Sequence, residues 1–256
     1  MSGAVLEAAD LRVSFGGVHA VDGVSVQLAE RTVLGLIGPN GSGKTSLLNA
    51  MTGVVPTTGR LYVGGDQVPL NRPERIRAAG VVRTFQAPQV LADLTCLDNA
   101  LLSPSDRRGT GVISAWLGRP WQARHEERRR ATALDALATV GLADHAERSA
   151  GTLTYGQQRL LELARALAGE PRVLLLDEPS AGLNDDETRS LTSLLRIVQE
   201  RGISMLLVDH KVDFIDELCD RVLVLELGRR VSEGSPAEIW ADARVRDAYL
   251  GGSAGA

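Results

Sequence analysis

The amino-acid sequence predicts an α/β fold built around a parallel sheet. Apolar segments of strand length alternate with segments of helical pattern, and the strands are expected at 33–38, 172–177, 203–209 and 221–226, with helices at 42–53, 185–201 and 211–219. The first strand runs directly into the glycine-rich loop GPNGSGKT (38–45), and the second ends in the acidic pair of DEP (177–179). Because parallel strands present their carboxyl ends at one edge of the sheet, we expect these two features to lie close together.

The remaining elements extend this pattern on both sides. Period-2 alternation at 4–15 and 24–37 and the short segment RLYVGG (60–65) predict strands. Residues from about 71 to 150 are mostly helical in pattern, clearest at 94–103 and 125–142, with a looser stretch at 104–122, and a further helix is expected at 155–169. We therefore expect one domain, 1–250, with a core at about 1–86 and 169–250, a helical insertion at about 87–168, and a flexible tail at 251–256.

Composition excludes several classes of protein. The formal net charge of −4 over 256 residues gives no general attraction to nucleic acid, and the run RHEERRR (124–130) contains two glutamates, as in a solvated helix face. Glu7 and Asp10 argue against a signal peptide, and no apolar run approaches the ~20 residues of a membrane helix. Cys96 and Cys219 match no metal or disulfide spacing, so we expect free thiols and no zinc site.

The loop GPNGSGKT fits the pattern G-x-x-x-x-G-K-[ST] and has the required strand before it and helix after it. Its glycines let backbone amides turn toward phosphate oxygens, Lys44 would bridge the β and γ phosphates, and the Thr45 hydroxyl would bind Mg²⁺. Only Lys44 and Lys211 of the 28 basic residues are lysines, which favours a specific role for Lys44. The candidate nucleotide-binding residues are Gly38, Pro39, Asn40, Gly41, Ser42, Gly43, Lys44, Thr45 and Ser46.

Three further candidates follow strands of the predicted sheet. Asp177 would hold Mg²⁺ through water, and Glu178 would orient or deprotonate the attacking water. His210 ends the strand ISMLLVDH and would donate a hydrogen bond to the γ-phosphate. The structural alternatives are an acidic turn without function for the carboxylates and an ordinary structural role for the histidine.

Other residues are ambiguous on the sequence alone. Phe15 is either a core residue or a stacking platform for adenine, and Gln86 is by itself only a polar loop residue after a short strand. In LTYGQQ (153–158), Thr154 and the amides at the start of helix 155–169 form either an anion site or simply a well-capped helix.

Taken together and in this order, GPNGSGKT, VRTFQ, LTYGQQ, LLLDEPSAGLN and VDH resemble the motifs of the nucleotide-binding subunit of ABC transporters, across nearly the whole chain. FGGVHAVDGVS (15–25), GVVRTFQ (80–86), TYGQQR, EPSAGLN (178–184) and AYLG (248–251) further resemble the LivG-type ATPases of branched-chain amino acid importers. The resemblance implies a P-loop NTPase fold of the ABC type, with an N-terminal antiparallel β subdomain and a helical subdomain inserted after Gln86.

The resemblance also implies roles for single residues. Glu178, His210 and Gln86 fall on hydrolysis positions, Thr45, Gln86 and Asp177 on magnesium positions, and Phe15 on the adenine-stacking position. The signature, expected to act on a nucleotide held by another chain, comprises Leu153, Thr154, Tyr155, Gly156 and Gln157. Thr154 and Tyr155 replace the commoner serine and glycine, and Asn184 replaces the commoner aspartate. Thr154 keeps the hydroxyl of the serine, and Tyr155 and Asn184 are usual in the LivG-like branch.

ATP and Mg²⁺ are the implied cofactors, and ATP hydrolysis is the implied reaction. Two chains would sandwich two ATP molecules head to tail and drive uptake through two separate transmembrane permeases, at the cytoplasmic face of the plasma membrane. The partner chain would be a second copy or a paralogous ABC ATPase, and an extracytoplasmic binding protein would be an indirect partner; no nucleic acid is expected. The alternative is a soluble ABC ATPase without a membrane partner, and a nucleotide-regulated binding protein without turnover would lack Glu178 or His210.

Overall fold

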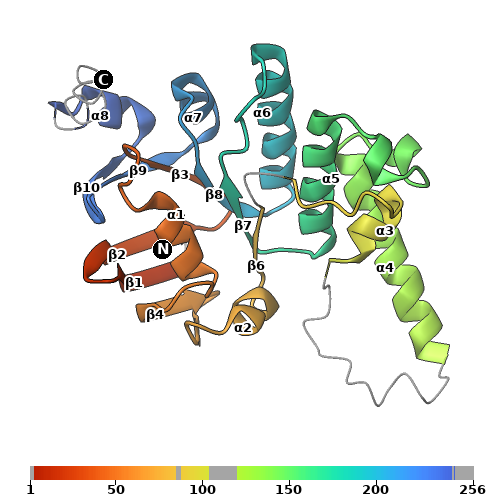
Figure 1. Ribbon diagram of the computed structural model, residues 1–256, viewed down its shortest axis with the longest axis horizontal. Helices are drawn as coiled ribbons and strands as arrows, with labels where there is room; N and C mark the ends of the chain where they lie inside the picture. Colours follow the sequence, from red (N-terminus) through yellow and green to blue (C-terminus); the bar gives the residue numbers. More distant parts are fainter. Residues whose placement is uncertain (1–2, 85–87, 104–119, 244, 246–256) are drawn as a thin grey trace. The chain divides into compact units, whose positions relative to one another are not determined.

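A computed structural model describes residues 3–84, 88–103, 120–243 and 245 of the chain (Figure 1). The chain divides into two compact units, Met1–Arg83 with Arg172–Ala256, and Thr84–Pro171. The predicted division of a single domain at 86/87 and 168/169 stays a prediction. Gln86 and the predicted tail 251–256 lie outside the described residues.

An antiparallel sheet forms the N-terminal part of the first unit, in the strand order β2-β1-β4-β5. Its strands are β1 (Ala4–Phe15), β2 (Val18–Ala29), β4 (Thr58–Val63) and β5 (Asp66–Val68). Leu11 and Val13 are buried as the alternation predicts, but a register shift between Val13 and Ser14 ends the alternation, and Phe15 is 50% exposed. The strand expected at 24–37 is two strands, because the chain turns at Arg31 with a φ of 58°.

The second sheet has the order β10-β9-β3-β8-β7-β6, and its strands pair in parallel except for β10, which is antiparallel to β9 (Figure 1). These strands are β3 (Val33–Ile37), β6 (Val81–Arg83), β7 (Val173–Asp177), β8 (Ser204–Val208), β9 (Arg221–Glu226) and β10 (Arg229–Gly234). Every residue of β3, β7 and β8 is buried, as in a sheet covered on both faces. The predicted α/β fold with a parallel sheet is confirmed.

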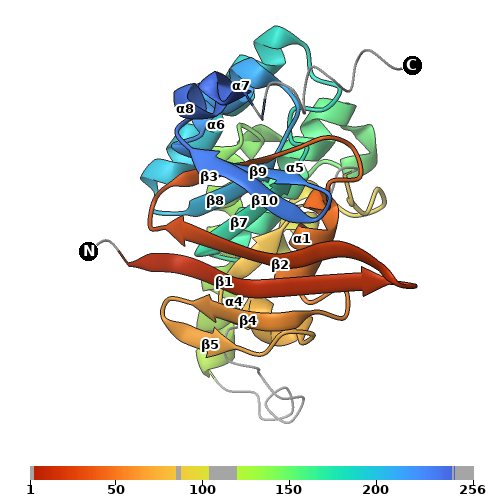
Figure 2. The same cartoon turned by 90° about the vertical axis from the view of Figure 1, so that its left-hand side faces the viewer.

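Helices cover both faces of this second sheet. The first unit contains α1 (Lys44–Met51), α2 (Pro73–Ala78), α6 (Asp185–Glu200), α7 (Val212–Leu218) and α8 (Pro236–Ala241). Helices α6 and α7 lie on one face, whereas α1 lies on the other face, between the two sheets (Figures 1 and 2). Leu47, Leu48 and Met51 of α1 share one buried apolar cluster with strands of both sheets. The helix that follows the glycine-rich loop is thus held rigidly from two sides.

The second unit is helical. Among its described residues, 84, 88–103 and 120–171, it contains α3 (Cys96–Leu101), α4 (Pro120–Thr139), α5 (Tyr155–Ala168) and the short 3₁₀ turns Ala143–His145 and Ala150–Thr152. Thr95 caps α3 by accepting a hydrogen bond from the Asp98 amide at 3.0 Å. Helix α4 begins at Pro120, before the position expected from the sequence, and α5 begins as predicted. Of the helices that the structure describes, none is long and apolar enough to cross a membrane.

Candidate nucleotide site

The glycine-rich loop leaves β3 at Gly38 and enters α1 at Lys44. A Cβ atom on Gly38 would lie 2.1 Å from the Leu225 carbonyl oxygen of β9, and one on Gly43 would lie 2.3 Å from the Ala20 carbonyl oxygen of β2. The turn between β9 and β10 also binds the loop, because the Gly228 amide donates to the Ser42 carbonyl at 2.9 Å. These glycines are therefore required by the packing of the loop as well as by its curvature.

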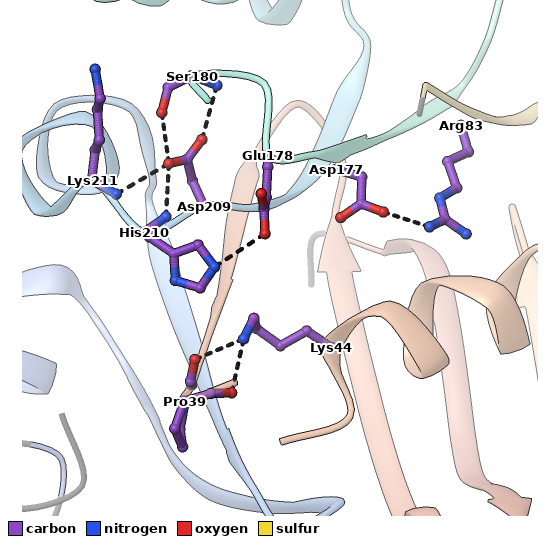
Figure 3. Close-up of polar contacts among 10 residues, drawn as sticks. Pro39, Lys44, Arg83, Asp177, Glu178, Ser180, Asp209, His210 and Lys211 are labelled. Carbon is purple, nitrogen blue, oxygen red and sulfur yellow. Dashed lines mark hydrogen bonds and ion pairs between the residues drawn. The ribbon is translucent and has the colours of Figure 1, made fainter. Parts of the chain in front are cut away.

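The Lys44 side chain bonds to the backbone of the glycine-rich loop. Its Nζ atom donates hydrogen bonds to the carbonyl oxygens of Gly38 (2.7 Å) and Pro39 (3.0 Å), as Figure 3 shows. Burial lowers the pKa of the Lys44 ammonium, while the nearby charges of Glu178 and Asp177 raise it. An ammonium has three donors and these bonds use two, so one remains for a ligand in the loop.

The start of α1 is built to receive an anion. Gly43 occupies the N-cap position, no side chain caps the helix, and its first turn contains no acidic residue. The first amides of the helix are thus available to a ligand and carry partial positive charge. Thr45 is exposed, and the buried Ser42 hydroxyl has no hydrogen-bond partner among the described residues. This arrangement of hydroxyl and amide donors fits phosphate oxygens.

Asp177, the last residue of β7, is held by an arginine that the sequence reasoning missed. The Arg83 guanidinium donates to Asp177 Oδ2 at 2.5 Å (Figure 3). It also donates to Asn49 Oδ1 of α1 at 2.5 Å. The side chains of Arg83 and Asp177 are only 6% and 10% exposed. An arginine at the end of the apolar strand VVR was the available signal, because a buried arginine requires an acidic partner.

Glu178 and His210 follow β7 and β8 and lie in contact. His210 Nε2 is 3.1 Å from Glu178 Oε1. The backbone of Glu178 has a φ of 49°, which is uncommon for a non-glycine residue, and its amide donates to the Val208 carbonyl at 2.8 Å. The structure thus brings together an acid and an imidazole that were predicted from separate strands, a pairing suited to proton transfer.

Two sequence-predicted residues are less defined. Phe15 lies half-exposed at the end of the β1–β2 hairpin, so core packing does not explain it, and its role in stacking stays a prediction. Gln86 lies outside the described residues.

The signature LTYGQQ begins α5 in the helical unit. Thr154 and Gln157 form a capping box: the Gln157 amide donates to Thr154 Oγ1 (3.3 Å), and the Thr154 amide donates to Gln157 Oε1 (3.0 Å). The Tyr155 ring is exposed, with the Arg159 guanidinium 5.1 Å from its centroid, and Leu153 is buried. Helix α5 is therefore well capped, while action of the signature on another chain's nucleotide stays a prediction.

Comparison with known proteins agrees with this geometry. Residues 21–181 match the family model described as ABC transporter, and residues 229–255 match the one described as branched-chain amino acid ATP-binding cassette transporter. The chain is 37% identical over 253 residues to the high-affinity branched-chain amino acid transport ATP-binding protein BraF of Pseudomonas aeruginosa, covering 98% of this chain and 99% of BraF. It is also 37% identical to LivG of Escherichia coli K12, with the same coverage. Nothing in these relatives favours a soluble ABC ATPase.

Solved structures extend the likeness to the fold. A nucleotide-free ATP-binding cassette from an ABC transporter superposes with a TM-score of 0.82 at 30% identity, covering 96% of this chain and 99% of that one. The ADP conformation of MJ1267, an ATP-binding cassette of an ABC transporter, gives 0.83 at 28% identity, with 97% and 99% covered. The chain therefore belongs to the ABC transporter family, as an ATP-binding subunit whose ATPase activity is coupled to transport.

Proposed function

We propose that this chain is the ATP-hydrolysing subunit of an importer of branched-chain or other hydrophobic amino acids. The observation that carries hydrolysis is the Glu178–His210 contact at the sheet edge that also carries the phosphate loop. The named transport role of the relatives BraF and LivG, and the match of residues 229–255, support the class of cargo.

The phosphate loop would hold the β and γ phosphates of ATP. The uncapped amides of α1, the third donor of Lys44 and the Ser42 hydroxyl supply donors for phosphate oxygens. Phe15, exposed at the hairpin end, would stack on the adenine base.

Mg²⁺ fits the same edge, because Asp177 and Thr45 offer the oxygen ligands that this ion prefers. Arg83 bonds to Asp177 Oδ2, which leaves Oδ1 to face a metal or its water. Gln86 is the proposed third contributor. When bound, the ion would neutralise charge on the phosphate oxygens.

Glu178 would accept or orient the proton of the attacking water, and His210, whose ring is fixed by Glu178, would donate to the γ-phosphate. Glu178→Gln is expected to keep ATP binding, to lose hydrolysis and to trap an ATP-bound dimer, measured by phosphate release and size-exclusion chromatography. Full ATPase activity in this variant would remove Glu178 from the mechanism.

LTYGQQ of each chain would close on the nucleotide held by the partner chain, a second copy or a paralogous ATPase. An added Cβ at Gly156 meets no atom within 4 Å, so Gly156→Asp introduces charge without a packing clash. We expect this variant to bind ATP as a monomer but not to close or hydrolyse, and Gly156→Ala serves as its uncharged control. Loss of ATP binding by the isolated Gly156→Asp chain would contradict action in trans.

Two membrane permeases would anchor the chain at the cytoplasmic face of the plasma membrane, and an extracytoplasmic binding protein would deliver the cargo. Co-purification of the permeases, followed by a screen of amino acids against the cognate binding protein, tests this assembly. A complex that lacks permeases, or a binding protein that ignores hydrophobic amino acids, would contradict the importer or the cargo respectively.

A further inference from the structure

Asp209 is a buried carboxylate at the end of β8 that the proposed roles do not use. It is only 3% exposed. Its Oδ1 atom accepts hydrogen bonds from the Ser180 hydroxyl (2.7 Å) and from the amides of His210 (2.7 Å) and Lys211 (3.1 Å), and its Oδ2 atom accepts one from the Ser180 amide (3.0 Å). An ionised carboxylate has about four acceptor positions, so these donors nearly saturate it.

These bonds join the two segments that carry the hydrolysis residues. Ser180 lies two residues after Glu178, and His210 directly follows Asp209. A non-glycine residue keeps a positive φ such as the 49° of Glu178 only where the surrounding structure holds its backbone in place. The hydrogen bonds between Ser180 and Asp209 hold the chain just after Glu178. The Asp209 carboxylate therefore fixes both segments that the 3.1 Å contact between Glu178 and His210 joins (Figure 3).

Lys211 holds the other end of the loop after Glu178. Its Nζ atom donates to the Leu183 carbonyl at 2.7 Å and to the Thr188 hydroxyl in the first turns of α6 at 2.9 Å. The Asn184 side chain caps α6 immediately after Leu183. The segment 209–211 therefore clamps the loop 179–184 at both ends, through Asp209 at one end and Lys211 at the other.

We propose that Asp209 is a positioning residue for ATP hydrolysis, acting by fixing Glu178 and His210 relative to each other, with Lys211 supporting the same loop. The inference rests on the proposed roles of Glu178 and His210. Among the described residues, Asp209 forms no hydrogen bond with the phosphate loop 38–46. Its effect therefore falls on the hydrolysis step and not on ATP binding.

Asp209→Asn tests this proposal, because it keeps the size of the side chain but turns an amide donor toward the donors that Asp209 accepts from. Misplacing a reacting group by about 1 Å can cost on the order of 100-fold, so we expect a kcat loss approaching this size with an unchanged Kd for ATP. Asp220→Asn is the matched control, since Asp220 accepts from the Val33 amide (2.7 Å) and from Gln199 (3.0 Å) at the opposite end of the sheet. Its kcat is expected to stay at the wild-type value.

A double-mutant comparison separates positioning from general destabilisation. In a His210→Ala background, Asp209→Asn should lower the residual ATPase activity much less than it does in the wild type, because one positioned partner is already gone. A merely structural loss would multiply equally in both backgrounds and would overturn the proposal. If Asp209→Asn does not fold, Ser180→Ala removes one donor only; a lower kcat with unchanged Kd supports the proposal, and wild-type kcat overturns it.

Glu178→Gln, measured beside these variants, separates the two hypotheses. An active Glu178→Gln would remove the proposed hydrolysis role and the inference together. An inactive Glu178→Gln with a fully active Asp209→Asn would remove only the inference.

Discussion

Replacing Arg83 by methionine should destabilise the chain far more than an average substitution. Methionine matches the length of the arginine stem but leaves the Asp177 carboxylate, 10% exposed, without the cation that lies 2.5 Å from it. Removing one partner of a buried ion pair costs about 3–5 kcal/mol, and the lost bond to Asn49 adds about 1 kcal/mol. The sum of roughly 4–6 kcal/mol approaches the lower end of the ~5–15 kcal/mol that stabilises a typical domain.

Urea unfolding at neutral pH, followed by circular dichroism, measures this loss. Arg12→Met is the control, because Arg12 is half-exposed and solvent screens its ion pairs with Asp10 and Asp22, so their loss should change the stability little. Adding Asp177→Asn to Arg83→Met should restore much of the stability, since no uncompensated charge then remains buried. A loss below about 1 kcal/mol, or the absence of rescue, would refute the argument from buried charge.

Three other outcomes are expected. In urea unfolding, Gly43→Ala should lower the free energy of unfolding by about 2–5 kcal/mol and Gly41→Ala by about 1–2 kcal/mol. Both residues have a positive φ, but only at Gly43 would the new Cβ atom clash with a backbone oxygen. Equal losses in the two variants would contradict this. The hydrogen bond from Arg229 of β10 lowers the pKa of Asp22. The difference in stability between the wild type and Asp22→Asn should therefore be full above a pH of about 4 and shrink as the pH falls through the lowered pKa. A difference that does not change with pH would contradict this. Burial raises the pKa of Cys219 to about 12 and also raises the pKa of Cys96. A thiol reagent should therefore label neither cysteine in the folded chain and both in urea. Fast labelling of the folded chain would contradict this.

Local signals predicted much of the fold and of the site. The phosphate loop, the residues after β7 and the strand before His210 are recognised from short motifs whose parts are adjacent in sequence. Strand β10 was missed because Arg229–Gly234 has no clear alternation and only its last residue is buried. Phe15 follows a register shift in the ladder, which a period-2 pattern cannot foresee.

The missed site residues share a different cause. Arg83 and Asp177 are 94 positions apart, and Asp209 lies 29 positions from Ser180. A buried charge is tolerated only with its partners, and these partners become neighbours only after the sheet has formed. The sequence shows an arginine and an aspartate at strand ends but not which groups they meet.

The contact between the phosphate loop and β2 has a thermodynamic consequence. Gly43 meets the Ala20 carbonyl, and Ala20 lies on the same strand that leaves the hairpin turn after Phe15. The elements proposed to hold the base and the phosphates are thus parts of one preformed body. A nucleotide that binds there would order little additional chain, so its affinity would lose little to conformational entropy.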